Sequence, residues 1–182
     1  MPYTPNPPPQ PNKRIYLNNT AEQWSGKERD VLNNLAFYPT PDQVPLLVGM
    51  YNGQVQVNAE SQARAEAQGN FFDNVTGTYL IGVNDVLEIV LRNQVGSNGV
   101  QIHPFHMHGG DFWDMGGGSG AFSEEAYQAI LDTVVPVRRD TTLLSAIPNG
   151  GGTTGASQGW RVFRWQPKNP GVWMLHWYLE LC

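Results

Sequence analysis

Glycine and proline interrupt this chain so often that long helices have little room. The 182 residues include 20 Gly and 14 Pro, and the segments between them are short runs rich in Val, Ile, Tyr, Phe and Trp. Such residues pack well on pleated strands, while Gly and Pro supply the turns that join strands. The sequence therefore predicts an all-β sandwich or barrel, and its length fits one domain with a sizeable core.

Charge and hydropathy exclude two kinds of partner. The formal net charge of -5 offers no basic surface for nucleic acid or for an anionic bilayer. The most apolar stretch, YLIGVNDVLEIVLRN, is broken by Asn84, Asp85 and Glu88, so it does not form a membrane-spanning helix. We therefore expect a soluble domain with no nucleic acid and no membrane partner.

The chain divides into a short arm and one domain. Residues 1–14 are rich in proline and predict an extended arm, and residues 15–182 form the single domain. KRIYLNN predicts a first strand, at the edge of a sheet. From there to about residue 57 the sequence predicts an irregular surface loop, because PTPDQVP holds three prolines in seven residues.

Two segments carry helix signals between the predicted strands. Asn58 can cap AESQARAEAQ, which Gly69 ends, and Ser123 can cap EEAYQAIL. We expect both helices to be short connections and not parts of the core. The strongest strand signal is TYLIGVNDVLEIVLRNQ, which predicts two strands or one strand bent at GVND, with one face in the core.

Three of the four histidines lie within six residues, in HPFHMHGGDFW. Side chains alternate along a strand, so His106 and His108 share a face, while the three-residue offset and a kink at Pro104 direct His103 elsewhere. Neutral imidazole is a common ligand for copper, zinc and iron. The cluster predicts metal ligands, and the plainer alternative is a set of buried, hydrogen-bonded histidines.

HPFHMHGGDFW resembles the H-P-x-H-L-H-G-H signature in the last domain of multicopper oxidases, the laccases, ascorbate oxidases and ferroxidases, especially those of fungi. KRIYLN, YLIGVNDVLEIVLRN, PVRRDTTLL and GWRVFRWQPKNPGVWMLH occur in the order expected of that domain. The resemblance implies a cupredoxin-like Greek-key β-sandwich with one or two short helices, and copper as cofactor. It implies that His103 is a ligand of the blue copper and that His106 and His108 are ligands of the trinuclear cluster.

The end of the chain departs from this family. Where the family has H-C-H-x-x-x-H, this chain has HWYLELC, and only His176, a cluster ligand by resemblance, matches. Trp177 stands at the blue-copper cysteine, Tyr178 at a cluster histidine and Cys182 at the second blue-copper histidine. Tryptophan offers copper no lone pair, so we expect no normal blue-copper site, and Cys182 could join His103 only as an accidental site.

The resemblance implies a function that this chain performs only in part. In the family the domain oxidises phenols or similar small reductants and reduces O2 to water, but about half of the cluster ligands come from another domain. We expect the chain to be inactive alone and to need the remaining oxidase domains, or another chain that completes a sheet lacking its closing strand. The resemblance also implies secretion, and the sequons at Asn18 and Asn74 are candidate glycosylation sites.

Two other functions remain open from the residues themselves. The chain could be a non-catalytic cupredoxin-like binding module. It could also be a mononuclear enzyme in which His106 and His108 hold one metal together with Asp111 or His176.

Charged residues near the histidines give weaker signals. Arg138, Arg139 and Asp140 predict an ion-pair network at a strand end, with a substrate path as the alternative. Asp111 and Asp114 predict solvated turn residues, with a reductant pocket as the alternative.

The resemblance also makes a geometric prediction. The strands that carry HPFHMH and WMLHWYLEL should be neighbours. His108 should then approach His176 on one side of the pair, and His103 should face Trp177 or Cys182 on the other.

Overall fold

The computed structural model describes residues 7–24, 26–33, 35, 44–96, 101–145 and 156–177. Most of the regular structure in these ranges is strand, which confirms the all-β class. The strands are β1 (Lys13–Trp24), β2 (Lys27–Leu32), β3 (Phe72–Asp73), β4 (Thr78–Tyr79), β5 (Leu87–Gln94), β6 (His103–Met107), β7 (Phe112–Ser119), β8 (Val137–Arg139), β9 (Thr141–Leu144), β10 (Ser157–Trp165) and β11 (Leu175–Trp177). The helices of the described part are α1 (Leu46–Tyr51), α2 (Ala59–Ala67) and α3 (Glu124–Leu131).

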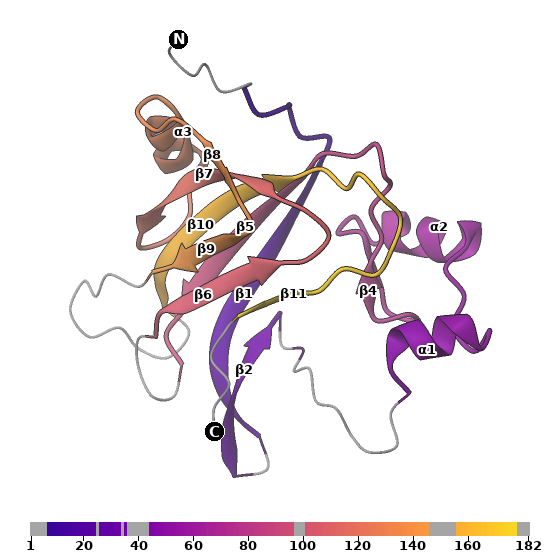
Figure 1. Cartoon of the computed structure of the whole chain (residues 1–182). Coiled ribbons are helices and arrows are strands. Elements are labelled where there is room, and N and C mark those ends of the chain that lie inside the picture. Colours follow the sequence, from indigo (N-terminus) through magenta and orange to yellow (C-terminus); the bar gives the residue numbers. More distant parts are fainter. Residues whose placement is uncertain are drawn as a thin grey trace.

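A six-stranded sheet forms the framework, in the order β2-β1-β5-β10-β7-β8. β1 runs parallel to β5, whereas β10 pairs antiparallel with both β5 and β7. A three-stranded sheet, in the order β11-β6-β9, lies in front of it in Figure 1. The two sheets enclose the main apolar core: Ile15, Leu17, Leu87, Ile89, Leu91, Phe105, Met107, Phe112, Leu144, Phe163 and Trp165.

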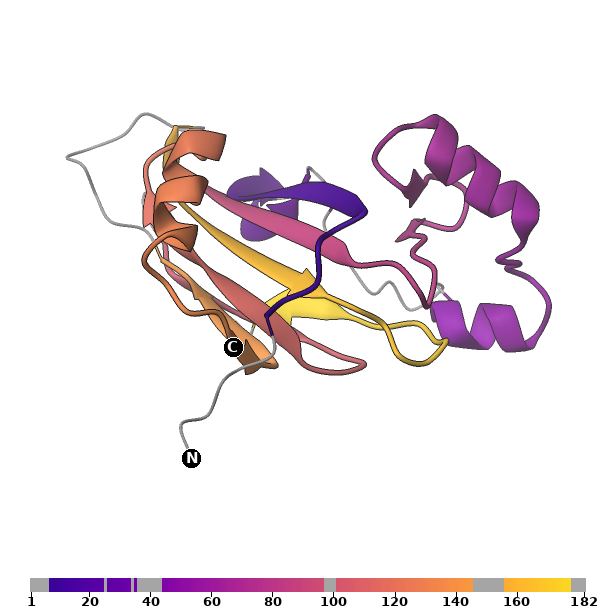
Figure 2. The ribbon, with the colours of Figure 1, turned by 90° about the horizontal axis from the view of Figure 1, so that it is seen from above.

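One face of the large sheet lies in the main core, as expected, and the other face is buried as well. Helix α3 lies beside β7 (Figure 2), and its Tyr127 packs with Val90, Trp113 and Trp160 in a second apolar cluster. Ser123 caps this helix through the backbone N–H of Ala126, as predicted. The helix is therefore part of the core and not only a connection, because its apolar stripe covers the sheet.

A buried carboxylate joins α3 to the sheet. Glu88 accepts hydrogen bonds from Arg164 Nε at 2.7 Å, from Arg14 Nε at 2.7 Å and from the Tyr127 hydroxyl at 2.8 Å. Burial opposes the charged form of Glu88, but the bonds from Arg164 and Tyr127 outweigh it and hold the pKa of this carboxyl below its usual range. The second guanidinium nitrogen of Arg164 donates to the carbonyl of Pro9, which places part of the proline-rich arm against the sheet.

The first part of the chain contains more regular structure than the sequence predicted. β1 is not the edge strand, because β2 lies outside it. β2 and α1 both fall in the stretch expected to be irregular, although residues 36–43, with most of PTPDQVP, lie outside the described residues. Helix α2 agrees with its prediction: Asn58 accepts the backbone N–H groups of Glu60 and Ser61 in a capping box.

The segment from α1 to β4 stands to one side of the sandwich (Figure 2). Arg64 of α2 forms two hydrogen bonds with Asp73 of β3, at 2.8 and 3.0 Å. The segment GVND follows β4 and separates it from β5, so the strongest strand signal forms two strands. Within the described ranges, no helix is long and apolar enough to cross a membrane.

Candidate metal centre

The site is built on β6 and β11, which are antiparallel neighbours, as predicted. His176 pairs in register with His106, and Trp177 pairs with Phe105. β6 runs unbroken through Pro104, which corrects the expected kink. Period-two alternation alone therefore divides the strand: its buried positions are His103, Phe105 and Met107, and its half-buried positions are Pro104 and His106.

The outer face of this pair brings three imidazoles together. The ring centroids of His106 and His108 are 4.8 Å apart, those of His108 and His176 are 5.1 Å apart, and those of His106 and His176 are 5.6 Å apart. Nε2 of His108 lies 3.0 Å from Nε2 of His176. The predicted approach of His108 and His176 is confirmed.

Backbone carbonyls fix the proton positions of two of these rings. His106 Nδ1 lies 2.9 Å from the carbonyl oxygen of Asp140, and His176 Nδ1 lies 3.1 Å from that of Trp177. A carbonyl oxygen only accepts, so each Nδ1 carries the proton and donates. In the neutral rings each of these two Nε2 atoms keeps its lone pair, so in the metal-free chain His108 Nε2–H donates to His176 Nε2, and a metal that binds between the two nitrogens must displace that proton. Partial burial, with the neighbouring His106 and His176, lowers the pKa of His108.

This geometry fits a metal held by pairs of imidazoles. Two nitrogens that bind one ion at about 2 Å lie about 2.8 Å apart at a right angle and about 4 Å apart when opposite. The 3.0 Å between the His108 and His176 nitrogens falls in this range. Among the described residues, however, no three His, Cys, Asp or Glu side chains are arranged to hold one ion. The face therefore offers part of a ligand set, which other ligands must complete.

On the inner face, by contrast, the described residues offer no thiolate for a blue-copper site. His103 is buried, at 2 % exposure, and its Nδ1 has no hydrogen-bond partner. The Trp177 ring approaches it edge-on, with centroids 6.2 Å apart, and also packs against Phe105. Burial lowers the pKa of His103 to about 4. The prediction that His103 faces Trp177 or Cys182 is confirmed for Trp177. Tyr178 and Cys182 lie outside the described residues.

The network predicted for Arg138, Arg139 and Asp140 forms only in part, because both arginines pair with other carboxylates and Asp140 lies 3.9 Å from His106 Nδ1. Arg138 pairs with Asp111 and lies over the Trp113 ring, 4.4 Å from its centroid. Arg139 lies 3.4 Å from Asp114. Asp111 is therefore engaged by an arginine, which weakens the hypothesis that it completes a mononuclear site.

Asp114 corrects another expectation, because it is no solvated turn residue. It lies within β7, at 2 % exposure, and accepts two bonds from Arg161, at 2.8 and 2.5 Å, and one from the Thr142 hydroxyl at 2.9 Å. Sequence reasoning missed this network because Arg161 follows 47 residues later. Asp114 ties the large sheet to β9, and so supports the strand that flanks β6.

The two sequons differ in setting. Asn18 lies within β1, where its backbone bonds Asn33, and Thr20 of the same sequon is buried. Asn74 is exposed in the turn between β3 and β4, and the Thr76 hydroxyl bonds Asp73 at 2.9 Å. Glycosylation at either asparagine stays a prediction, and the exposed turn favours Asn74.

The two packed sheets define a cupredoxin-like domain, and β6 and β11 gather three imidazoles on its outer face. The sequence profile of the family "Multicopper oxidase" matches residues 39–180. The chain belongs to the multicopper oxidase family.

Curated relatives agree with this assignment. A laccase-like multicopper oxidase of Thermothelomyces thermophilus is 37 % identical over 140 residues, which cover 72 % of this chain and 21 % of the relative. An L-ascorbate oxidase of Nicotiana tabacum is 29 % identical over 193 residues, which cover 97 % of this chain and 30 % of the relative. The chain thus spans less than a third of the length of these relatives.

Solved structures show the same fold. The laccase of Botrytis aclada aligns with a TM-score of 0.54 at 17 % identity, over 91 % of this chain and 25 % of that one. Fet3p, a multicopper oxidase that functions in iron import, aligns with a TM-score of 0.54 at 20 % identity, over 93 % of this chain and 29 % of that one. The cupredoxin-like fold expected from the sequence is confirmed.

Proposed function

We propose that this chain is the C-terminal copper-binding domain of a multicopper oxidase, and that it supplies one half of a shared copper cluster. The observation that carries the proposal is the outer face, where His106, His108 and His176 gather from two neighbouring strands. Because the described residues give this face no complete ligand set, further ligands come from the remaining domains of the oxidase. Copper is favoured over zinc at imidazole sites by the Irving–Williams order.

The chain's own residues prepare this face for the metal. The carbonyls of Asp140 and Trp177 hold the Nδ1 protons, and this orients the rings of His106 and His176. Bound copper would supply the electron transfer that links oxidation of a reductant to reduction of O2. Asp114 of β7 accepts hydrogen bonds from Arg161 of β10 and from Thr142 of β9. These bonds tie β9, the neighbour of β6, to the large sheet and so support the strand that carries the histidines.

The reaction proposed for the whole assembly is oxidation of a phenol or a similar small reductant with reduction of O2 to water, and the name of the L-ascorbate oxidase relative gives one such small reductant. We propose that the protein is secreted, and that the chain alone turns over no reductant faster than free copper does. These proposals depend on parts of the oxidase beyond this chain.

Calorimetric titration with Cu(II) at neutral pH tests the ligand assignment. The wild-type chain should bind copper, and the His106→Ala/His108→Ala double variant should bind it at least tenfold more weakly. His103→Gln is the matched control, because His103 lies on the inner face, and its affinity should stay within twofold of wild type. Equal copper uptake by the double variant would exclude these histidines as the site.

The inner face supports a second candidate, a cupredoxin-like module that does not accept electrons from a reductant. Its specific observation is Trp177, which packs on His103 where the family places a thiolate. Absence of copper binding by the wild-type chain at neutral pH would favour this candidate over the first.

A further inference from the structure

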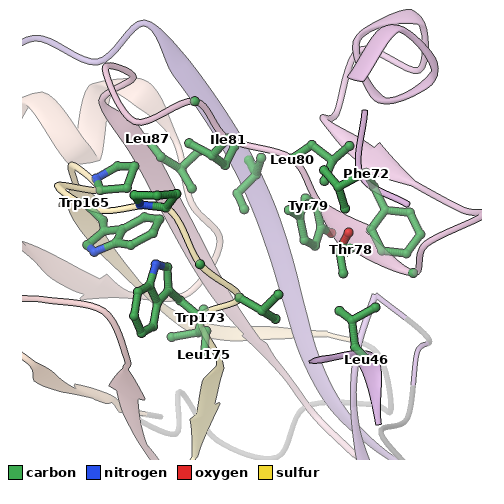
Figure 3. A pocket seen from close by; sticks show the side chains of 18 of the residues that line it. Leu46, Phe72, Thr78, Tyr79, Leu80, Ile81, Leu87, Trp165, Trp173 and Leu175 are labelled. Carbon is green, nitrogen blue, oxygen red and sulfur yellow. The ribbon is translucent and has the colours of Figure 1, made fainter. Parts of the chain in front are cut away.

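A cavity of about 860 Å³ opens between the large sheet and the segment that carries α1 and β4 (Figure 3). Its floor includes Ile15 and Trp165, which belong to the main core. Leu46 of α1 and Tyr79 of β4 form the opposite wall, and Leu175 of β11 contributes from the small sheet. The cavity therefore continues the space between the sheets at the end where the small sheet stops.

The lining of this cavity has an unusual charge pattern. Among the described residues that line it, none has an acidic, basic or histidine side chain, and the polar side chains include Asn58, Gln62 and Thr78. An ion that entered would lose water without gaining a partner, which is costly. The volume lies in the range of small-molecule sites, roughly 300 to 1,000 Å³.

One wall of the cavity is fixed in place by glycines. A Cβ at Gly109 would lie 2.4 Å from the Trp173 ring, and one at Gly171 would lie 2.6 Å from it, so the indole packs directly on both backbones. Trp173 Nε1 also donates to the carbonyl of Asn169 at 3.3 Å. An aromatic wall that is held in this way needs little rearrangement to receive a ligand.

We propose that this cavity binds a neutral, largely apolar small molecule. The cavity is separate from the histidine face and requires no metal. The inference therefore goes beyond the proposed function, and its failure would leave the copper-binding proposal standing. The aromatic rings of Trp165, Trp173 and Tyr79 favour a ligand with a flat ring, which can stack or pack edge-on.

Fluorescence titration of the metal-free chain with two dyes tests the proposal. Phenylnaphthylamine is neutral, and anilinonaphthalene sulfonate has the same rings with an added anion. The neutral dye should saturate at one per chain, bind at least tenfold tighter than the sulfonate, and quench tryptophan emission. Binding without saturation, or equal affinity for both dyes, would overturn the proposal.

A pair of neighbouring variants on α1 locates the dye. Leu46 lines the cavity, whereas Leu47 is 60 % exposed and does not. Leu46→Asp should weaken the neutral dye at least tenfold, and Leu47→Asp, with the same charge on the same helix, should stay within twofold. Equal effects would contradict the proposed site, and the two-dye comparison on wild type decides the matter if Leu46→Asp fails to fold. A dimer that dissociates as the dye binds would show that a second copy occupies the cavity, which also overturns the proposal.

Discussion

Strand β6 carries histidines on both of its faces, and the two faces differ in burial, partners and ionisation. His103 on the inner face is buried against Trp177, and its pKa is lowered to about 4. His106 and His108 on the outer face lie with His176 at the surface, within about 6 Å of one another. The same residue type thus serves as core packing on one face and as candidate ligand on the other. The difference shows that each face must be compared with the family separately. Trp177 alters the blue-copper position on the inner face and leaves the three histidines of the outer face in place.

The largest expected effect concerns copper affinity and pH on the outer face. Protons compete with the metal for imidazole, whose ordinary pKa is about 6.5. Copper affinity should fall at least about a hundredfold between pH 7.5 and pH 5.5, because two imidazoles with this pKa each lose about tenfold of their unprotonated form. The lowered pKa of His108 should keep that ring available to copper at lower pH. Calorimetry at several pH values measures this. Affinity that does not change over this range would show that imidazoles are not the ligands.

The inner face should influence folding stability and not metal binding. The folded pKa of His103, about 4, lies below its ordinary value of 6.5, so the unfolded chain binds more protons between these values. The stabilisation is therefore complete above about pH 6.5 and is lost as pH falls toward 4, by up to about 3 kcal/mol. Urea unfolding at a series of pH values should show this loss, and His103→Leu should flatten the curve in that window. A His103→Leu curve that is parallel to wild type would contradict the assignment.

Truncation of Trp177 should open the inner face at a moderate cost. The side chain is half-buried and packs on Phe105 and His103, so Trp177→Ala should lower the free energy of unfolding by about 2 kcal/mol. Met174→Ala is the control, because Met174 is 51 % exposed, and it should cost less than about 0.5 kcal/mol. Denaturant unfolding distinguishes the two, and equal costs would show that the indole does not close this face.

The smallest effect concerns the turn that follows His108. Gly109 and Gly110 both have positive φ, at 80° and 136°, but only a Cβ at Gly109 would meet the Trp173 ring. Gly109→Ala should therefore destabilise the chain by at least about 1 kcal/mol more than Gly110→Ala, since both variants share the backbone strain. Thermal unfolding of both variants checks the difference. Equal losses would show that the Trp173 contact is not tight.

Short-range patterns gave the parts of the fold that depend on a few neighbouring residues. The caps at Asn58 and Ser123 predicted where α2 and α3 begin, because a side-chain oxygen satisfies backbone N–H groups two or three residues away. Period-two alternation likewise predicted that His106 of β6 and His108, which directly follows the strand, lie on one side. The family resemblance added the pairing of β6 with β11, which the pattern alone could not give.

Long-range partners account for what the sequence did not show. Asp114 was expected in solvent, but Arg161 and Thr142 from distant strands enclose it. α1 was missed because Gly49 interrupts its short apolar run and Pro45 precedes it, while its Gly49 packs near Val55 and its Leu46 lines the cavity. The kink expected at Pro104 is absent because β6 remains paired on both sides.

The visible absorption spectrum of the chain titrated with Cu(II) tests the difference between the two faces of β6 most directly. Copper bound by His106, His108 and His176 alone has only imidazole ligands, and Trp177 replaces the thiolate that a blue site requires. We predict that copper is taken up at neutral pH with weak absorption and without an intense thiolate-to-copper band. An intense blue colour on copper loading would contradict the account, because it would require a thiolate beside His103 on the face that Trp177 closes.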